Sequence, residues 1–329
     1  MIRNLWYPIF DSSWVKPNQV VGITRLGEKL VLWRRADREV ACMSDRCSHR
    51  GALLSRGRVK DGCLECPYHG LRFTSSGRCV RIPANGLDVP VPRTLDMPTR
   101  LIREEHGLIW LWHGESEDAA SQLPWFDTAP EPNRGVASFQ REFPVSYLRI
   151  MENLTDFHHA PFVHRWTIPG LGPRVDDFKL ENPEDELAVT CTMRHYRDAK
   201  DSKRGVTFIT RIKLPTLATI EVFPGVRFVL TATPIDADRT WLYVRYGQDH
   251  VPWWLGGKLL AWLAVAWDFN LVFSRQDMPI LRSPQLTDPE DISSYHLFPA
   301  DRGAAAFFAM RKRLLQRTDA GPSGERFSA

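Results

Sequence analysis

Short runs of apolar and β-branched residues alternate with turn residues through the first third of the chain. Between Gln19 and Ser44 these runs are punctuated by turn signals such as Leu26-Gly27, a pattern that predicts successive antiparallel strands. An apolar run at Gly107–Trp112 predicts another strand, and a polar, proline-rich segment follows it. We therefore predict a mainly β domain over residues 1–115.

The rest of the chain combines strand patterns with one long helical pattern. A strand near Phe139–Val145 precedes a predicted helix over Tyr147–His159, and a second helix is predicted from about Trp254 to Leu281. Grouped strands followed by a long helix predict an α+β domain with the helix lying across an antiparallel sheet. We assign this domain to residues 116–316 and a flexible tail to residues 317–329. Further strands are predicted near Leu187–His195, Val206–Lys213, Thr219–Phe223, Arg227–Thr233 and Trp241–Tyr246.

The composition is that of a folded globular protein. Hydrophobic residues make up 43% and charged residues 25%, which excludes global disorder and a polytopic membrane protein. Leu259–Trp267 is apolar on every side but too short to cross a bilayer. We expect it to be buried in the domain or at a subunit contact, with a membrane-surface contact as the alternative. No secretory signal follows Met1, so we expect a cytoplasmic protein.

Two cysteine–histidine pairs form the first candidate metal site. Five of the six cysteines lie within 38 residues, which in a reducing compartment favours a metal site over disulfides. Cys47-x-His49 and Cys66-x2-His69 lie in two turn-rich segments. Zinc accepts two thiolates and two imidazoles. One thiolate and one imidazole from each of two loops is, however, the ligand arrangement of a Rieske [2Fe–2S] centre, with thiolates on one iron and imidazoles on the other.

A second group of candidate ligands lies downstream. Asp156 and His159 are three residues apart and share a helix face, whereas His158 is expected to point elsewhere. His164 follows His159 by five residues, a rotation of roughly 140° on a regular helix. Pro161 interrupts the helix and allows His164 to return beside His159. Two histidines and one carboxylate would form the facial triad of a non-haem Fe(II) site.

The carboxylate of this triad has two candidates on the long helix. Asp268 and Asp277 are nine residues apart, about half a turn out of phase on a regular α-helix, so at most one of them faces the metal.

Both motifs resemble those of the Rieske non-haem iron oxygenases. The resemblance rests on Cys47-Ser48-His49-Arg50-Gly51, on Cys66-Pro67-Tyr68-His69-Gly70 and on the spacing Asn153-x2-Asp156-x2-His159-x4-His164, and it covers about residues 5–285. Gln276–Leu281 is similar to the family segment that carries the distal carboxylate, so Asp277 is the implied ligand and Asp268 is expected on a solvated face. Cys42, Cys63 and Cys79 are not ligands on this match.

The resemblance implies a Rieske domain followed by a helix-grip catalytic domain. Cys47, His49, Cys66 and His69 would hold one [2Fe–2S] cluster, and His159, His164 and Asp277 would hold one Fe(II). The family arrangement is a homotrimer in which His69 of one subunit approaches Asp156 of the next. Asp156 would then be an electron bridge that also binds His159, and Asn153 would support the site.

The chain contains no glycine-rich dinucleotide motif, so we expect a separate NAD(P)H-dependent flavin reductase, with or without a ferredoxin. Residues 1–115 carry 18 basic and 12 acidic residues, against 25 and 27 in the remainder. This excess suits an acidic electron donor, although a merely solvated basic face is the alternative. The basic residues that flank the two loops are Arg46, Arg50, Arg56, Arg58, Lys60, Arg72, Arg78 and Arg81.

The implied reaction is hydroxylation or oxidative demethylation of a small, largely apolar or aromatic molecule. Monooxygenation is favoured over cis-dihydroxylation, and a Rieske electron-transfer protein with an inactive second site is the alternative from another class. The pocket is expected to include Leu154, Phe157, His158 and Phe162. The sequence does not choose a substrate.

Overall fold

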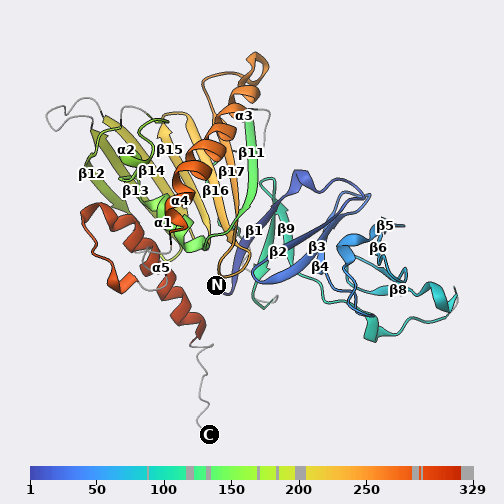
Figure 1. Cartoon of the computed structure of the whole chain (residues 1–329). Coiled ribbons are helices and arrows are strands. Elements are labelled where there is room, and N and C mark those ends of the chain that lie inside the picture. The colour runs from blue at the N-terminus through green and yellow to red at the C-terminus, as the bar shows by residue number, and fades with distance from the viewer. Residues whose placement is uncertain are drawn as a thin grey trace, which may run out of the picture. The chain divides into compact units, whose positions relative to one another are not determined.

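The computed structural model describes residues 1–86, 89–115, 122–130, 135–168, 171–182, 185–196, 205–283, 289 and 292–319. The chain divides into two compact units (Figure 1). The N-terminal unit comprises Trp6–Ala119 and Pro234–Ala237, and the C-terminal unit comprises Met1–Leu5, Ala120–Thr233 and Asp238–Ala329. The predicted domain boundary at residue 115 adjoins residues 116–121, which lie outside the described residues.

The N-terminal unit is built almost entirely of strands, as predicted. They form three antiparallel sheets, ordered β1-β10-β9, β2-β3-β4 and β5-β6-β7-β8. The strands are β1 Leu5–Asp11, β2 Val20–Arg25, β3 Glu28–Arg34, β4 Val40–Ser44, β5 Arg58–Lys60, β6 Cys63–Glu65, β7 Arg72–Phe73, β8 Cys79–Arg81, β9 Ile102–Glu105 and β10 Leu108–His113. The strands predicted between residues 19 and 44 and at residues 107–112 are therefore present.

Two loops project from these sheets, one after β4 and one between β6 and β7, and they carry the two cysteine–histidine pairs. The bases of both loops belong to a hydrophobic core that contains Trp33, Leu64, Phe73 and both motif cysteines. Because the cysteines are part of this core, the packing that folds the unit also fixes the positions of their thiols.

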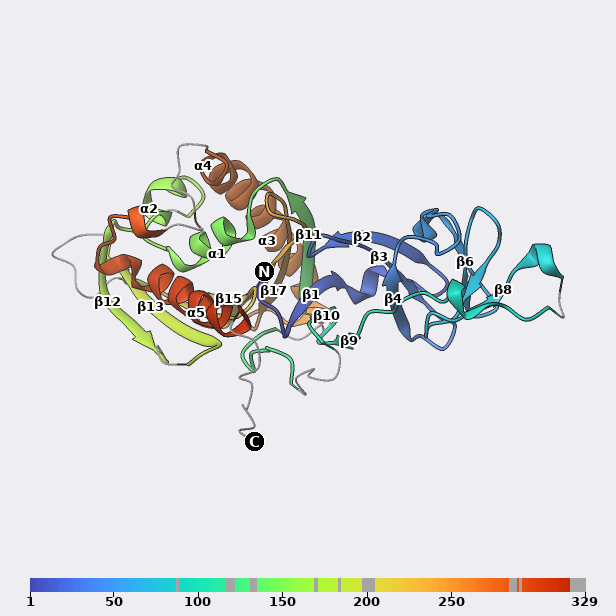
Figure 2. The same cartoon turned by 90° about the horizontal axis from the view of Figure 1, so that it is seen from below.

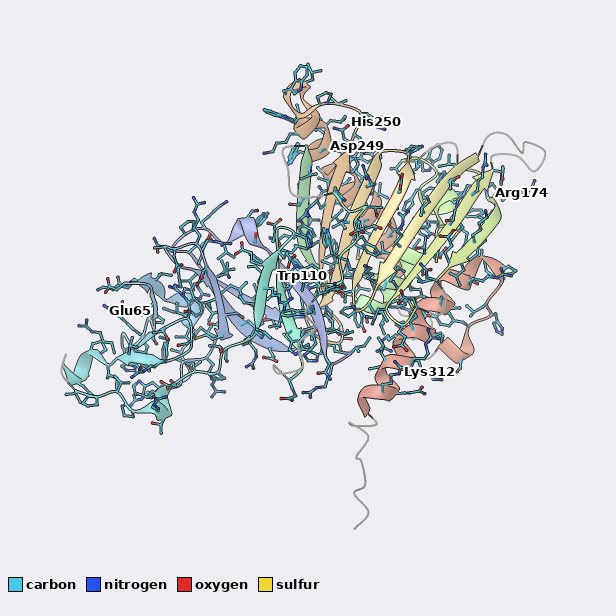
Figure 3. The ribbon with its side chains drawn as sticks, turned by 180° about the vertical axis from the view of Figure 1, so that it is seen from behind. Glu65, Trp110, Arg174, Asp249, His250 and Lys312 are labelled. Carbon is cyan, nitrogen blue, oxygen red and sulfur yellow. The ribbon has the colours of Figure 1, made fainter. Side chains whose placement is uncertain are left out.

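The C-terminal unit is a seven-stranded antiparallel sheet with helices on one face (Figures 1 and 3). Its order is β11-β17-β16-β15-β14-β13-β12, and the predicted α+β class is confirmed. The five strands predicted between residues 187 and 246 begin and end within two residues of the observed ones; β12 was not predicted. The strands are β11 Val136–Phe143, β12 Arg174–Glu181, β13 Ala188–Tyr196, β14 Gly205–Lys213, β15 Leu217–Phe223, β16 Val226–Pro234 and β17 Thr240–Gln248.

The helix predicted over residues 147–159 ends four residues early, and a second short helix follows it. The first, α1, spans Tyr147–Thr155 and begins after an N-cap at Ser146. It ends because Asp156 is extended, and α2 then spans Ala160–Val163. Pro161 lies in the first turn of α2, where proline is tolerated, so the break precedes the proline instead of following from it.

The long predicted helix is present but contains a π-helix. It consists of α3 (Gly257–Trp267), a π-helix over Asp268–Asp277 and α4 (Met278–Leu281). It packs against β11 and β17. The last helix, α5 (Arg302–Asp319), packs against α1 and β13 (Figure 2). Residues 317–319, assigned to the tail, therefore extend this helix, and residues 320–329 lie outside the described residues.

Helix α3 is only half buried. Ala261 and Val265 face the core, whereas Leu259 and Trp267 are 61% and 52% exposed. The expectation that this run is buried within the domain is thus wrong for its outer face, and contact with another subunit or a membrane surface stays a prediction. Within the described residues, no helix is long and apolar enough to cross a membrane.

Two glycines in the N-terminal unit have similar strained backbone conformations but differ in the space around them. Substituting each by alanine therefore distinguishes backbone strain from steric clash. Gly77 and Gly62 both have positive φ, +80° and +74°. A Cβ at Gly77 would lie 2.0 Å from the Met97 carbonyl oxygen, but one at Gly62 would meet nothing within 4 Å. We expect Gly62→Ala to cost about 1–2 kcal/mol in stability and Gly77→Ala clearly more, measured by chemical unfolding. Equal losses would contradict the role assigned to the close approach.

Candidate metal centres

The two cysteine–histidine loops have the same local construction. In the first, the Gly51 N–H donates to the Cys47 carbonyl at 2.8 Å; in the second, the Gly70 N–H donates to the Cys66 carbonyl at 3.1 Å. Both glycines have positive φ, near +70°, which lets each loop close within five residues. The result is two similar turns, each presenting one buried thiol and one more exposed imidazole.

The four side chains pair by type. The rings of His49 and His69 lie 4.6 Å apart, centre to centre. The buried Cys47 thiol interacts with that of Cys66: burial and this neighbour raise the pKa of Cys47 to about 11, against the lowering effect of backbone N–H groups. Bound iron would shift such thiols to the thiolate. Thiols on one side and imidazoles on the other fit the two irons of a Rieske cluster.

A single zinc ion fits the same residues less well. Four tetrahedral donors would lie within about 4 Å of one another, but no three of these four residues gather their donor atoms within 4.8 Å. The three remaining cysteines of the region, Cys42, Cys63 and Cys79, lie on strands β4, β6 and β8, away from the loop tips. Burial raises the pKa of Cys42 to about 12, as expected for a structural thiol.

In the C-terminal unit, His159, His164 and Asp277 converge. They come from the start of α2, its end and the last position of the π-helix. The three facing atoms, Nε2 of each histidine and Oδ1 of Asp277, form a triangle with edges of 3.3, 3.3 and 3.5 Å. Among the described residues, this is the group whose ligand atoms all lie within 4.8 Å of one another.

The triangle has the dimensions of a metal-binding facial triad. Its centre is about 2 Å from each corner, which is compatible with ordinary metal–ligand bond lengths of about 2.0–2.2 Å. Asp277 Oδ1 is buried without a well-formed hydrogen bond, as expected of an atom that binds a cation. One side of the ion would stay open to other ligands.

Polar side chains surround both imidazoles, and Gln276 orients that of His164 through its second ring nitrogen. His164 Nδ1 lies 2.9 Å from Gln276 Oε1, which also accepts a bond from Thr167. Asn153 Nδ2 lies 3.5 Å from His159 Nε2. Burial lowers the pKa of His164, but Asp277 and Gln276 outweigh it and raise the pKa overall. Sequence reasoning missed Gln276 as an orienting residue, although its place beside Asp277 was a signal.

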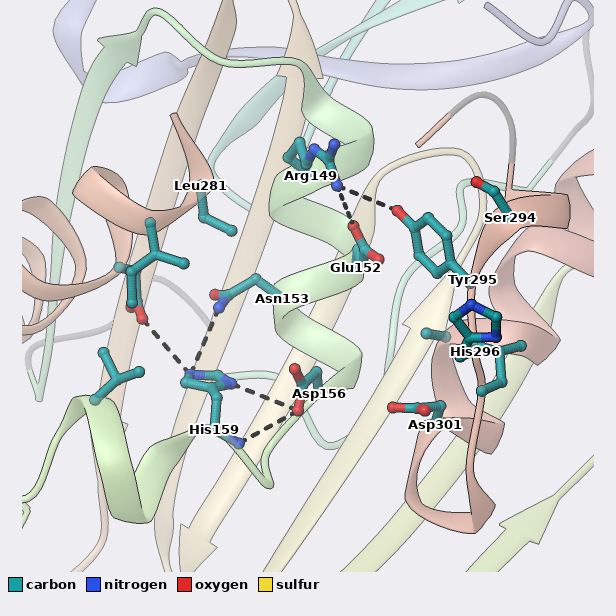
Figure 4. A pocket seen from close by; sticks show the side chains of 15 residues that line it. Arg149, Glu152, Asn153, Asp156, His159, Leu281, Ser294, Tyr295, His296 and Asp301 are labelled. Carbon is teal, nitrogen blue, oxygen red and sulfur yellow. Dashed lines mark hydrogen bonds and ion pairs between the residues drawn. The ribbon is translucent and has the colours of Figure 1, made fainter. Parts of the chain in front are cut away.

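Asp156 lies on the far side of the His159 ring. Its Oδ1 is 3.6 Å from His159 Nδ1 (Figure 4). The same oxygen is 2.7 Å from His158 Nδ1. These imidazoles hold the pKa of Asp156 well below its usual range despite burial, and Asp156 in turn raises the pKa of His158. The expectation that His158 points elsewhere is wrong, because residues 156–158 are not helical. His158 also contacts Asp301, at 3.5 Å.

Two cavities meet at the triad, and both are lined by Asn153, His159 and Asp277. The first, about 370 Å³, is lined by both charged and apolar side chains (Figure 4). It includes Arg149, whose Nη1 donates to Glu152 and to the Tyr295 hydroxyl. The second, about 100 Å³, lies against β14, β15 and β16 and is lined mainly by apolar side chains. We call them the mixed cavity and the apolar cavity.

The apolar cavity changes two expectations from the sequence. Leu154 and Phe157 line it as predicted, but His158 and Phe162 line neither cavity, and Phe162 is 65% exposed. Asp268, expected on a solvated face, lines the apolar cavity. The reason is the π-helix: each of its turns takes between four and five residues, so nine residues make close to two full turns. Asp268 and Asp277 therefore face the same side.

Comparison with known proteins agrees with this geometry. Residues 5–93 match the Rieske [2Fe-2S] domain, and residues 143–317 match the vanillate O-demethylase oxygenase C-terminal domain. Aminopyrrolnitrin oxygenase PrnD of Pseudomonas fluorescens is 35% identical over 55% of this chain and 51% of its own length. The oxygenase component of dicamba O-demethylase from Stenotrophomonas maltophilia is 35% identical over 50% and 48%, respectively. The match thus spans about half the length of these relatives.

A solved structure shares the whole fold. The crystal structure of dicamba monooxygenase bound to dicamba superposes with a TM-score of 0.77, over 97% of this chain and 99% of that one, at 20% identity. The C-terminal match covers more than half of the chain, and the Rieske domain precedes it. The chain therefore belongs to the Rieske non-haem iron oxygenase family, with a C-terminal domain of the vanillate O-demethylase oxygenase type.

Proposed function

We propose that the protein is the oxygenase component of a Rieske system that hydroxylates or oxidatively demethylates a small, largely apolar molecule. The observation that carries this proposal is the open triangle of His159, His164 and Asp277 beside an apolar cavity. A purely structural metal site has all of its coordination positions filled by protein side chains. Three ligands beside an apolar cavity instead leave coordination positions free for dioxygen near a bound substrate.

Each iron group has its own ligands in this proposal. Cys47, His49, Cys66 and His69 hold the [2Fe–2S] cluster, and the triad holds Fe(II). When bound, these groups supply one-electron transfer and dioxygen activation. The chain contributes the rest: Gln276 and Asp156 hold the two imidazoles, and the apolar wall excludes water and positions the substrate.

We also propose that the active form is a homotrimer in which His69 of one subunit approaches Asp156 of the next. Two features of Asp156 support this role. Its side chain is 31% exposed, so a second imidazole can reach it, and it already contacts the His159 nitrogen that faces away from the triad. A carboxylate between two imidazoles orients both rings.

Electrons are proposed to arrive from a separate NAD(P)H-dependent flavin reductase, directly or through a ferredoxin, in the cytoplasm. Arg46, Arg50, Arg56 and Arg78 are exposed around the two loops, and so are Arg58 and Lys60. Arg72, which we expected on this surface, does not belong to it. It is buried on β7 and forms ion pairs with Glu65 and Asp61. The remaining cations suit an acidic donor.

Iron content tests the proposal against the electron-transfer alternative. The holoprotein should contain about three irons per chain, two in the cluster and one in the triad, whereas a relay protein should contain two. Asp277→Ala should lower the count to about two and leave the Rieske visible spectrum unchanged, because the cluster ligands lie in the other unit. Asp249→Asn, an exposed control, should retain three. A count of three in the Asp277 variant would contradict the assigned ligand.

The bridging role of Asp156 has a matched control. Asp156→Asn should keep both iron centres yet reduce product formation by about 100-fold or more, because the amide cannot hold both imidazoles as a charged acceptor. Asp301→Asn also removes a carboxylate that contacts His158, but one with no contact to His159; its effect should be small. If the Asp156→Asn variant turns over substrate at the wild-type rate, Asp156 is not the electron bridge between subunits.

Donor docking should respond to salt and to charge. Added salt should raise the KM for the acidic donor without bleaching the cluster, because screening weakens attraction between exposed charges. Arg50→Ala should raise this KM several-fold, whereas Lys16→Ala, also exposed but outside the two loops, should not. If the KM is insensitive to both salt and Arg50→Ala, the donor does not dock on this surface.

A further inference from the structure

The apolar cavity contains one carboxylate that the proposed chemistry does not use. Of its polar lining residues, His159, His164 and Asp277 form the triad and Asn153 lies against His159. The remaining one is Asp268. The apolar side chains that line the same cavity include Phe208 from β14, Ile220 and Val222 from β15, and Phe228 and Leu230 from β16.

Asp268 lacks a partner within the described part of the chain. No hydrogen bond or ion pair joins its carboxylate to a described residue, in contrast with Asp277, Asp156 and Asp301, which all contact imidazoles. Asp268 as a residue is partly exposed, but burial around its carboxyl group and the negative charge of Asp277 raise its pKa to about 7, against a smaller opposing effect of His164. A carboxylate in this setting is costly unless a donor or a cation reaches it.

We propose that Asp268 is the specificity-determining residue of the apolar cavity, where it binds an amine N–H of a compact apolar substrate and rejects carboxylate substrates. The inference deepens the proposed function, because it takes the apolar cavity to be the substrate site. Hydrocarbon walls with one acceptor at a fixed point provide both affinity and orientation. A cavity of about 100 Å³ suits a single-ring skeleton.

The position of Asp268 also selects the atom that reacts. Asp268 and Asp277 stand at opposite ends of the π-helix. They are nine residues apart in sequence, about two turns of this helix. An amine held by Asp268 is therefore kept away from the triad, and a carbon at the other end of the molecule is presented to it. The anchored nitrogen is a recognition group, and the attacked carbon lies elsewhere on the skeleton.

Binding measurements on the iron-loaded protein test this without any turnover. We would compare benzylamine, its neutral isostere ethylbenzene and the anion benzoate by calorimetry, with no reductant present. The wild type should bind benzylamine about tenfold or more tightly than ethylbenzene, and benzoate more weakly than either. Asp268→Leu should abolish the amine preference and keep or improve ethylbenzene binding. Asp268→Asn, which retains an acceptor without the charge, should lie between.

A matched control removes a charge elsewhere in the same unit. Asp127 is exposed, so Asp127→Asn should leave all three affinities unchanged. An iron count of three in Asp268→Leu shows that the triad has survived the substitution. Equal benzylamine affinity in the wild type and Asp268→Leu, no amine preference in the wild type, or tight benzoate binding would overturn the inference. If instead the proposed oxygenase function is wrong, the protein would lack the third iron or show no turnover, while the relative affinities for benzylamine, ethylbenzene and benzoate would stay as predicted.

Discussion

The C-terminal unit depends on the packing of one interrupted helix against its sheet. Phe269 and Phe273, in the π-helix, lie against Phe143 of β11 with ring centres 5.6 and 5.3 Å apart. Both belong to the main hydrophobic core, and burying two aromatic side chains contributes several kcal/mol of stability. This packing fixes the axial rotation of the helix, and so places Asp277 beside two histidines that lie more than a hundred residues earlier in the chain.

The two iron sites are stabilised in different ways. In the N-terminal unit, two short loops with the same turn geometry place their cysteines in a hydrophobic core. In the C-terminal unit, the ligands are held by side-chain contacts: Gln276 with His164, and Asp156 with His159. The first arrangement depends mainly on backbone conformation and the second on a polar network, so single substitutions are expected to be more informative in the second.

Part of the candidate site was predictable from the sequence, because most of the proposed ligands lie in short motifs. Each cysteine–histidine pair spans four residues or fewer, and His159 and His164 are separated by one short helix, so motif spacing together with the family resemblance made them candidate ligands. Strand limits between residues 187 and 246 were close to those expected from strand-like runs in the sequence. The placement of Asp268 and His158 could not be derived, because both inferences assumed regular α-helical geometry. The chain departs from that geometry at residues 156–158 and again at residues 268–277.

The π-helix makes the length of this segment as important as its side chains. On a regular helix each residue turns the chain by about 100°, so removing any one residue between Asp268 and Asp277 would restore ordinary pitch and swing the carboxylate out of reach of both imidazoles. The lining of the apolar cavity and the proposed metal ligand share this single stretch of backbone. We therefore expect the exposed positions of the segment to tolerate substitution better than the segment tolerates insertion or deletion.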